Sequence, residues 1–348
     1  MLDLKEVINM KNKKYILSFL LFILLFGITY FYIFRKYDFN LLINTLKSCN
    51  ILYIILGLIS MIMYPVFEAI FIKRFFKYLD CDVSFYQALG YTFTEIYFSG
   101  ITPSSTGGQP VQMLEMKKDN ITYSKSTTVV IFNTIMYKMT LIFLLVLSLI
   151  FFSKDIFSKF SLFKWLVIGG SLFNILFILF LISLLYSNKV INFVKKCFNY
   201  IVRHIKIIKN KDKLIEKFDK TINEYREASL VIKGNYKMVI ESFVILLLQR
   251  ISILIISYFV YRSFGFNEFN IFLIIAFQVF ITIASDFVPT PGGVMVAEGI
   301  MISINKYLYG NINDVSAMLL QRSISFYFLI IISFIFYLIF HYDKKRRL

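Results

Sequence analysis

Long apolar runs separated by short polar segments make up most of this chain. Six runs reach the roughly 20 residues that a helix needs to cross the hydrocarbon core of a bilayer. They are Tyr15 to Phe34, Ile51 to Ile72, Thr127 to Phe152, Leu166 to Tyr186, Val239 to Val260 and Val315 to Phe340. The pattern predicts an all-α integral membrane protein with about six full transmembrane helices, forming a single polytopic domain over residues 1–348.

Two further apolar stretches, Tyr91 to Met116 and Ile271 to Ile304, are broken near their centres. The breaks are Gly-Ile-Thr-Pro-Ser-Ser-Thr-Gly-Gly-Gln-Pro at residues 100–110 and Val-Pro-Thr-Pro-Gly-Gly at residues 288–293. Proline removes a backbone donor and glycine pairs permit tight reversal, so neither stretch is expected to be one continuous helix. Each is predicted to be a broken hairpin that enters the membrane and returns. Backbone of this kind is tolerated at membrane depth only where protein or a watery cavity surrounds it.

Positive charge favours a re-entrant first hairpin over a spanning one. Residues 188–236 carry twelve Lys and Arg against five Asp and Glu, which is typical of a cytoplasmic segment. If the N-terminus is inside and the first hairpin returns, this segment and the basic tail at residues 344–347 both lie inside. Abundant Ile, Lys, Asn, Phe and Tyr are typical of an AT-rich bacterial genome. We therefore expect a multi-pass protein of the bacterial cytoplasmic membrane with both termini cytoplasmic.

The basic segment at residues 188–236 also shows helical periodicity. Its apolar positions are Val190, Val194, Cys197, Ile201, Ile205 and Ile208, then Leu214, Phe218, Ile222, Tyr225 and Ser229. Two amphipathic helices lying on anionic inner-leaflet lipids are expected, the alternative being a connector packed on the protein's own cytoplasmic face. The net charge of +17 gathers beside apolar runs, so it indicates membrane lipids rather than nucleic acid as partner.

The two hairpins occupy equivalent places in two similar halves of the chain. The halves are residues 51–152 and 239–341. Glu115 precedes Lys138 by 23 positions in the first half, and Glu298 precedes Arg322 by 24 in the second. Three crossings separate the hairpins, and an odd number inverts one relative to the other. The pattern predicts an inverted repeat whose hairpins enter from opposite sides, an arrangement found in many secondary transporters.

Three cations lie in apolar helices, where charge is costly. Lys138 is eleven residues into its predicted helix, Arg250 is equally deep, and Arg322 is seven residues in. A lone cation at the bilayer centre costs at least about 2.5 to 3.5 kcal/mol, so each should face the interior and find a carboxylate or a ligand anion. Glu68, Glu95, Glu115, Asp286 and Glu298 are the available acids. The plain alternative is a set of structural ion pairs that fix helix packing.

Polar hairpin residues near three cations suit a phosphate-bearing head group, because Arg and Lys bind phosphate and neutral side chains add hydrogen bonds. The predicted substrate-binding residues are Thr102, Pro103, Ser104, Ser105, Thr106, Gly107, Gly108, Gln109, Glu115, Lys138, Arg250, Asp286, Pro289, Pro291, Gly292, Gly293, Glu298 and Arg322. No catalytic residue and no cofactor is predicted. Three scattered cysteines and two histidines make a metal site or a disulfide framework improbable.

These motifs resemble the flippase-like transmembrane region of lysylphosphatidylglycerol synthases and of free-standing proteins similar to it. The resemblance rests on Thr102-Pro103 with Gly107-Gly-Gln-Pro110, on residues 288–293 followed by Glu298, and on Arg250 and Arg322. Met295 departs from it, since a further small residue is expected there. Only a basic tail follows Phe340, so we expect a free-standing member without the aminoacyltransferase domain, to which a lysyltransferase label would come only by inheritance.

The resemblance implies movement of a phospholipid or polyprenyl-phosphate-linked lipid, with an anionic or aminoacylated head group, between leaflets. Three alternatives stay open at this point. The chain could be a membrane-embedded enzyme acting on a lipid head group, although it shows no nucleophile and base pair. It could carry a small solute or an ion. It could be a membrane component that serves a separately encoded lipid synthase.

Overall fold

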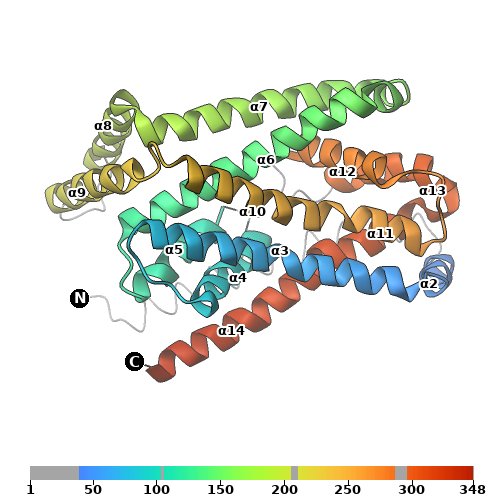
Figure 1. The fold of residues 1–348 in the computed structure, drawn as a ribbon, viewed down its shortest axis with the longest axis horizontal. Coiled ribbons are helices and arrows are strands. Elements are labelled where there is room, and N and C mark those ends of the chain that lie inside the picture. The colour runs from blue at the N-terminus through green and yellow to red at the C-terminus, as the bar shows by residue number, and fades with distance from the viewer. Residues whose placement is uncertain (1–38, 103–105, 205–210, 287–295, 348) are drawn as a thin grey trace.

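The structure is a computed structural model that describes residues 39–102, 106–204, 211–286 and 296–347, and every regular element in these ranges is helical (Figure 1). The elements are α2 (Phe39–Lys47), α3 (Ile51–Tyr78), α4 (Phe85–Ile101), α5 (Gly108–Lys118), α6 (Tyr123–Phe157), α7 (Ser161–Tyr186), α8 (Asn188–His204), α9 (Lys211–Leu230), α10 (Tyr236–Leu254), α11 (Ile256–Ser263), α12 (Ile271–Asp286), α13 (Val296–Arg322), the π-helical turn η3 (Ser323–Phe328) and α14 (Leu329–Arg347). The predicted all-α class is confirmed.

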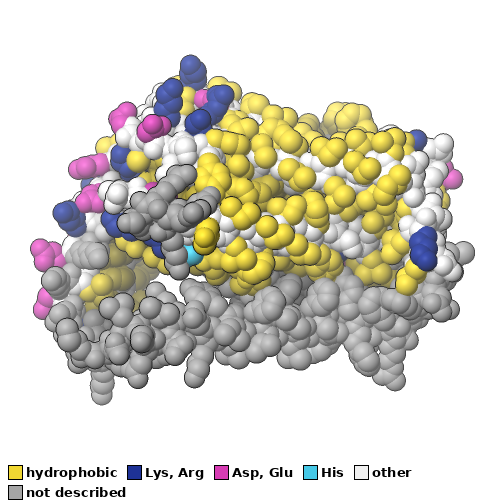
Figure 2. Space-filling model, turned by 90° about the horizontal axis from the view of Figure 1, so that it is seen from below, with side chains coloured by type: hydrophobic (Ala, Val, Ile, Leu, Met, Phe, Trp, Pro, Cys, Tyr) yellow, Lys and Arg dark blue, Asp and Glu magenta, His cyan; other side chains and the backbone are white. Residues whose placement is uncertain are grey.

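Five helical spans are long and apolar enough to cross a membrane. They are Ile51–Tyr78, Tyr123–Lys154, Lys164–Tyr186, Tyr236–Ser263 and Asn313–Tyr342. Each contains one of the predicted membrane helices, and the sixth prediction, Tyr15 to Phe34, lies outside the described residues. Figure 2 shows a broad apolar surface between two ends that carry charged side chains. This distribution is what a lipid-facing belt requires, so the described chain is a multi-pass membrane protein.

Local sequence explains where several helices begin. The side chains of Asn50, Ser84, Thr122 and Asn235 each accept a hydrogen bond from a backbone N–H in the first turn of the helix that follows. Ser84 forms a full capping box, because Gln87 also accepts from the Ser84 backbone N–H. Such caps satisfy donors that a helix leaves unpaired at its start, which fixes these boundaries without tertiary contacts.

The order of elements is similar in the two halves. In the first, α3 is followed by a turn at Asp80 (φ 49°), the pair α4 and α5, a turn at Asn120 (φ 60°) and α6. In the second, α10 and α11 are followed by a turn at Gly265 (φ 84°), then α12 and the start of α13. Gly310 has φ 74° and ψ 175°, so the chain turns there before continuing through η3 into α14.

Contacts between the halves are extensive. Helix α3 packs against α10 and α11, α4 packs against α14, and α12 packs against α6 and α7. In Figure 1, α4 and α5 lie at the end of the molecule that holds α8, α9 and the C-terminal end of α14, whereas α12 and α13 lie at the opposite end. The two short-helix pairs therefore occupy opposite ends of one bundle.

Helices α8 and α9 fill the predicted basic segment. The Phe198 and Phe218 rings stack with centroids 3.7 Å apart, which joins the two helices. Helix α9 packs on α6 and α7, and Tyr225 and Ser229 from its predicted apolar line are buried there. The alternative of packing on the protein's own surface thus holds for α9. Helix α8 instead keeps Tyr200 exposed, together with Phe193 and Ile201.

Candidate functional site

Polar side chains from three long helices meet inside the apolar bundle. Glu68 of α3 is only 4% exposed. Its Oε1 accepts a hydrogen bond from Asn133 Nδ2 of α6 at 3.2 Å, and its Oε2 accepts one from Gln249 Nε2 of α10 at 2.8 Å. Buried polar groups need such partners, because an unpaired one costs about 1 to 3 kcal/mol. This triad therefore fixes α3, α6 and α10 around a carboxylate.

Arg250 lies next to this triad and is 3% exposed. Its guanidinium carbon sits 3.4 Å from the centroid of the Tyr137 ring of α6, a cation–π contact that retains the positive charge. Nε and Nη2 of Arg250 are buried without a hydrogen-bond partner among the described residues. Glu68 and Asp286 are near enough to interact with it electrostatically. Arg250 is thus a buried cation with free donors.

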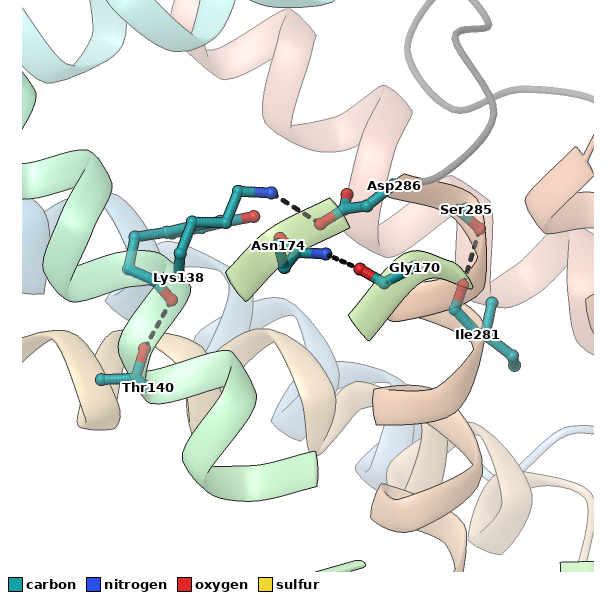
Figure 3. Close-up of polar contacts among 8 residues, drawn as sticks. Lys138, Thr140, Gly170, Asn174, Ile281, Ser285 and Asp286 are labelled. Atoms are coloured by element: carbon teal, nitrogen blue, oxygen red, sulfur yellow. Dashed lines mark hydrogen bonds and ion pairs between the residues drawn. The ribbon is translucent and has the colours of Figure 1, made fainter. Parts of the chain in front are cut away.

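Lys138 of α6 pairs with Asp286, the last residue of α12, and the two come from opposite halves of the chain (Figure 3). Lys138 Nζ is 2.6 Å from Asp286 Oδ2, with side chains 14% and 25% exposed. Asp286 immediately precedes residues 287–295, which lie outside the described ranges. The pair therefore ties the edge of the second broken stretch to the middle of α6.

A close approach of α7 to α12 helps to place Asp286. A Cβ atom at Gly170 would collide with the backbone carbonyl of Ile283, so only glycine fits this contact. One turn further along α7, Asn174 is fully buried and its Nδ2 donates to the Gly170 carbonyl at 2.8 Å (Figure 3). The spacing between α7 and α12 thus depends on a missing side chain.

Arg322 and Glu298 approach each other in the second half, as their spacing in the sequence suggested. Arg322 Nε lies 3.5 Å from Glu298 Oε1, with side chains 13% and 3% exposed. The π-helical turn η3 begins directly after Arg322. Turns of this kind are rare and frequently lie at functional sites.

The matching pair expected in the first half does not form as its spacing suggested. Glu115 forms an ion pair with Lys118, one turn further along α5, and Lys138 pairs with Asp286. Of the five acids that the sequence offered, the structure thus pairs Lys138 with Asp286. Glu115 is buried in α5 and packs toward the end of the bundle, whereas Lys138 lies in mid-α6. Similar spacing of charges in two halves does not fix their pairing, because the facing helices differ.

The first broken stretch is a true break, since α4 ends at Ile101 and α5 begins at Gly108. Thr102 bridges it: its hydroxyl donates to the Phe98 carbonyl at 2.6 Å and accepts from the Gly107 N–H at 2.9 Å. A Cβ at Gly108 would collide with the Glu95 carbonyl and the Ser99 hydroxyl. The glycine pair was predicted to permit a reversal of the backbone. Gly107, however, has ordinary helical φ and ψ, and Gly108 is needed because a side chain there would not fit.

Gln109 connects α5 to α6, where its Nε2 donates to Thr134 Oγ1 at 2.9 Å. Thr106 is described and exposed. Seven predicted site residues lie outside the described ranges, namely Pro103, Ser104, Ser105, Pro289, Pro291, Gly292 and Gly293. The described part of the site thus consists of the cations, their acids and the flanks of the two breaks.

Sequence reasoning missed Asn133 and Tyr137 as members of this centre. They lie four positions apart in α6, so they share one face of the helix, next to Lys138. The signal that could have identified them is the helical spacing of an amide and a tyrosine beside the buried cation Lys138. Over the described ranges, no three His, Cys, Asp or Glu side chains gather as a metal site would require.

Comparison with known proteins gives two similarities. Residues 15–333 match the family described as the lysylphosphatidylglycerol synthase TM region, which confirms the resemblance that the hairpin motifs suggested. A UPF0104 membrane protein of Archaeoglobus fulgidus is 26% identical over 107 residues, or 31% of this chain and 33% of that protein. The matched segment thus spans about a third of the length of this relative.

Proposed function

Because this chain belongs to the family of the lysylphosphatidylglycerol synthase transmembrane region, we propose that it moves a lipid between the two leaflets of the membrane. The proposed substrate is a phospholipid or a polyprenyl-phosphate-linked lipid with an anionic or aminoacylated head group. The observation that carries the proposal is Arg250, a cation buried in the middle of the bundle with two donors that no described residue uses.

A phosphate group suits the donors of Arg250 chemically. A guanidinium presents several N–H donors in a fixed fork that matches two phosphate oxygens, and such charge-assisted bonds are strong. Lys138 would supply a second positive charge once the phosphate competes with Asp286 for it. Arg322 and Glu298 form the corresponding pair in the second half. In this proposal the acids balance the cations in the empty protein and give way to the substrate.

The shape of the bundle supports an inverted-repeat transporter. The contacts between helices follow a two-fold pattern. Helix α3 packs against its counterpart in the second half, α10 with α11, and the contact of α4 with α14 corresponds to the contact of α12 with α6. The short-helix pairs lie at opposite ends of the molecule (Figure 1). In the proposal both pairs are re-entrant hairpins that meet near the membrane centre, and rocking of one half against the other opens the site to each leaflet in turn.

The proposed orientation places α8, α9 and both termini in the cytoplasm, with the exposed side of α8 against the anionic inner leaflet. Single cysteines in a cysteine-free background test it in intact cells. Asp82→Cys, Asn120→Cys and Glu216→Cys are expected to react with an impermeant maleimide only after permeabilisation, whereas Glu268→Cys and Lys306→Cys react from outside. Asp82 and Asn120 flank α4 and α5, so labelling of these two from opposite sides would exclude a re-entrant first hairpin.

Lipid movement is tested directly in proteoliposomes. Fluorescent phosphatidylglycerol is placed in both leaflets, and the outer-leaflet fraction is followed by its reduction with dithionite. The reconstituted protein is expected to make nearly all of the label accessible, whereas protein-free vesicles leave about half protected. Mass spectrometry of the recovered lipid should show it unchanged. A chemically modified lipid without leaflet exchange would favour the head-group enzyme. If the lipid is neither exchanged nor modified, the transport proposal has no support.

A further inference from the structure

The buried carboxylate of Glu68 cannot bind a phosphate, because both groups are anionic, and no Lys or Arg within the described ranges lies at ion-pair distance from it. Its hydrogen-bond donors are the neutral amides of Asn133 and Gln249. A carboxylate held in apolar surroundings by amides alone is expensive as an anion. Such a group is retained at membrane depth chiefly where it binds something.

A second carboxylate increases this cost. Glu95 of α4 is near enough to Glu68 to repel it electrostatically, and Glu95 Oε1 accepts a hydrogen bond of 2.7 Å from Ser99 within its own helix. Two carboxylates that share one buried site cannot both ionise cheaply, and a single shared proton relieves the repulsion. Asp286 is already paired to Lys138, and Arg250 attracts Glu68 from beyond ion-pair distance.

Two unused acceptors lie beside Glu68. Asn133 Oδ1 and Gln249 Oε1 are buried without a hydrogen-bond partner in the described part of the chain. Gln249 is 1% exposed, and its other amide atom already contacts Glu68. A half-turn of either amide would direct its oxygen at the carboxyl group, where it could accept a hydrogen bond only from a protonated acid. The amides can therefore serve both forms of Glu68.

The groups that interact with Glu68 are Tyr64 of α3, Glu95 of α4, Asn133 of α6, and Gln249 and Arg250 of α10. Tyr137 of α6 and Asp286 of α12 lie next to Arg250, and Lys138 of α6 pairs with Asp286. Helix α11 and η3 meet α3 nearer its other end, where Arg262 donates to Tyr53 and Ile324 packs on Gly57. Arg250 is the cation with which Glu68 interacts electrostatically.

We propose that Glu68, with Glu95 and the amides of Asn133 and Gln249, binds one proton that is exchanged with water on either side and couples lipid movement to the proton gradient. An O–H bond forms at the Glu68 carboxylate when a hydronium ion gives up its proton, and it breaks when the proton returns to water. Neutral Glu68 no longer attracts Arg250, which is then free for a phosphate. This inference rests on the proposed lipid transport.

The test measures the leaflet ratio of fluorescent phosphatidylglycerol in proteoliposomes under an imposed pH gradient. One proton per lipid predicts a shift of about tenfold in that ratio per pH unit, since one unit is worth about 1.4 kcal/mol. Glu68→Gln, which resembles the protonated acid, is expected to show no shift. Glu241→Gln is the matched control, because this acid of α10 pairs with Arg74 at the end of the bundle and should respond like the natural protein.

The outcomes separate the two proposals. Failure of the natural protein to exchange lipid at all refutes transport itself. Exchange with a ratio that ignores the pH gradient, or that follows a sodium gradient instead, overturns only the proton site. An unaltered response in Glu68→Gln overturns the assignment to Glu68. If that variant does not fold, Gln249→Leu tests the assignment. It removes one amide that donates to the Glu68 carboxylate, so the pH at which transfer is half-maximal must rise. An unchanged midpoint contradicts the proposal.

Discussion

Replacing Arg250 with methionine is expected to slow lipid transfer by about 10- to 150-fold, which corresponds to the roughly 1.5 to 3 kcal/mol of hydrogen bonding to a charged group. The protein should stay folded. Nε and Nη2 of Arg250 satisfy no described acceptor, and methionine keeps most of the apolar stem that packs on Tyr137. The measurement is dithionite-resolved transfer, together with the melting temperature in detergent.

Arg262→Met is the matched control for this variant. Arg262 lies in the last turn of α11, far from the centre, and donates to the Tyr53 hydroxyl, so its loss should leave transfer near the natural rate. Parallel loss of folding and transfer in Arg250→Met would assign Arg250 a structural role. Normal transfer in Arg250→Met, Lys138→Met and Arg322→Met together would end the phosphate-site hypothesis.

Replacing Lys138 with methionine is expected to destabilise the protein by about 3 kcal/mol and to abolish transfer. It leaves the Asp286 carboxylate, which is 25% exposed, without its cation inside the bundle, and breaking such a pair costs about 3 to 5 kcal/mol when it is fully buried. Restoring neutrality with Asp286→Leu in the same chain should recover most of the melting temperature. Transfer should not return, because the charge that would hold the phosphate is still missing.

The double variant distinguishes the binding role from a purely structural ion pair. If the pair only fixes packing, Lys138→Met with Asp286→Leu recovers both stability and transfer. Lys195→Met is the control: Lys195 pairs with Asp219 at 3.3 Å between α8 and α9, where the carboxylate is 40% exposed, and such pairs contribute about 1 kcal/mol or less. A loss of stability in Lys195→Met as large as that in Lys138→Met would contradict this account of burial.

Local sequence was enough to predict most of the helices. A run of apolar residues predicts a membrane helix because burial in lipid depends on length and composition alone, so five predicted helices recur as spans. The break after Ile101 was predicted from Pro103, because proline acts on its own backbone, whereas the need for Gly108 came from packing on Glu95 and Ser99. The lines of apolar residues in α8 and α9 likewise predicted helices. The side of α9 that faces the protein depended on α6 and α7 and was not encoded locally.

Which buried charges meet is settled only when the helices pack. Lys138 reaches Asp286 across 148 positions, and Gln249 reaches Glu68 across 181, whereas the similar spacing of Glu115 and Lys138 misled. Sequence by itself determined where this chain is helical, where it breaks and that charges lie inside the bundle, because hydrophobicity and backbone chemistry act locally. The tertiary structure decided the partners of those charges and left Arg250 with two donors that no described residue uses, because an ion pair depends on a few ångströms between helices that spacing along the chain does not specify.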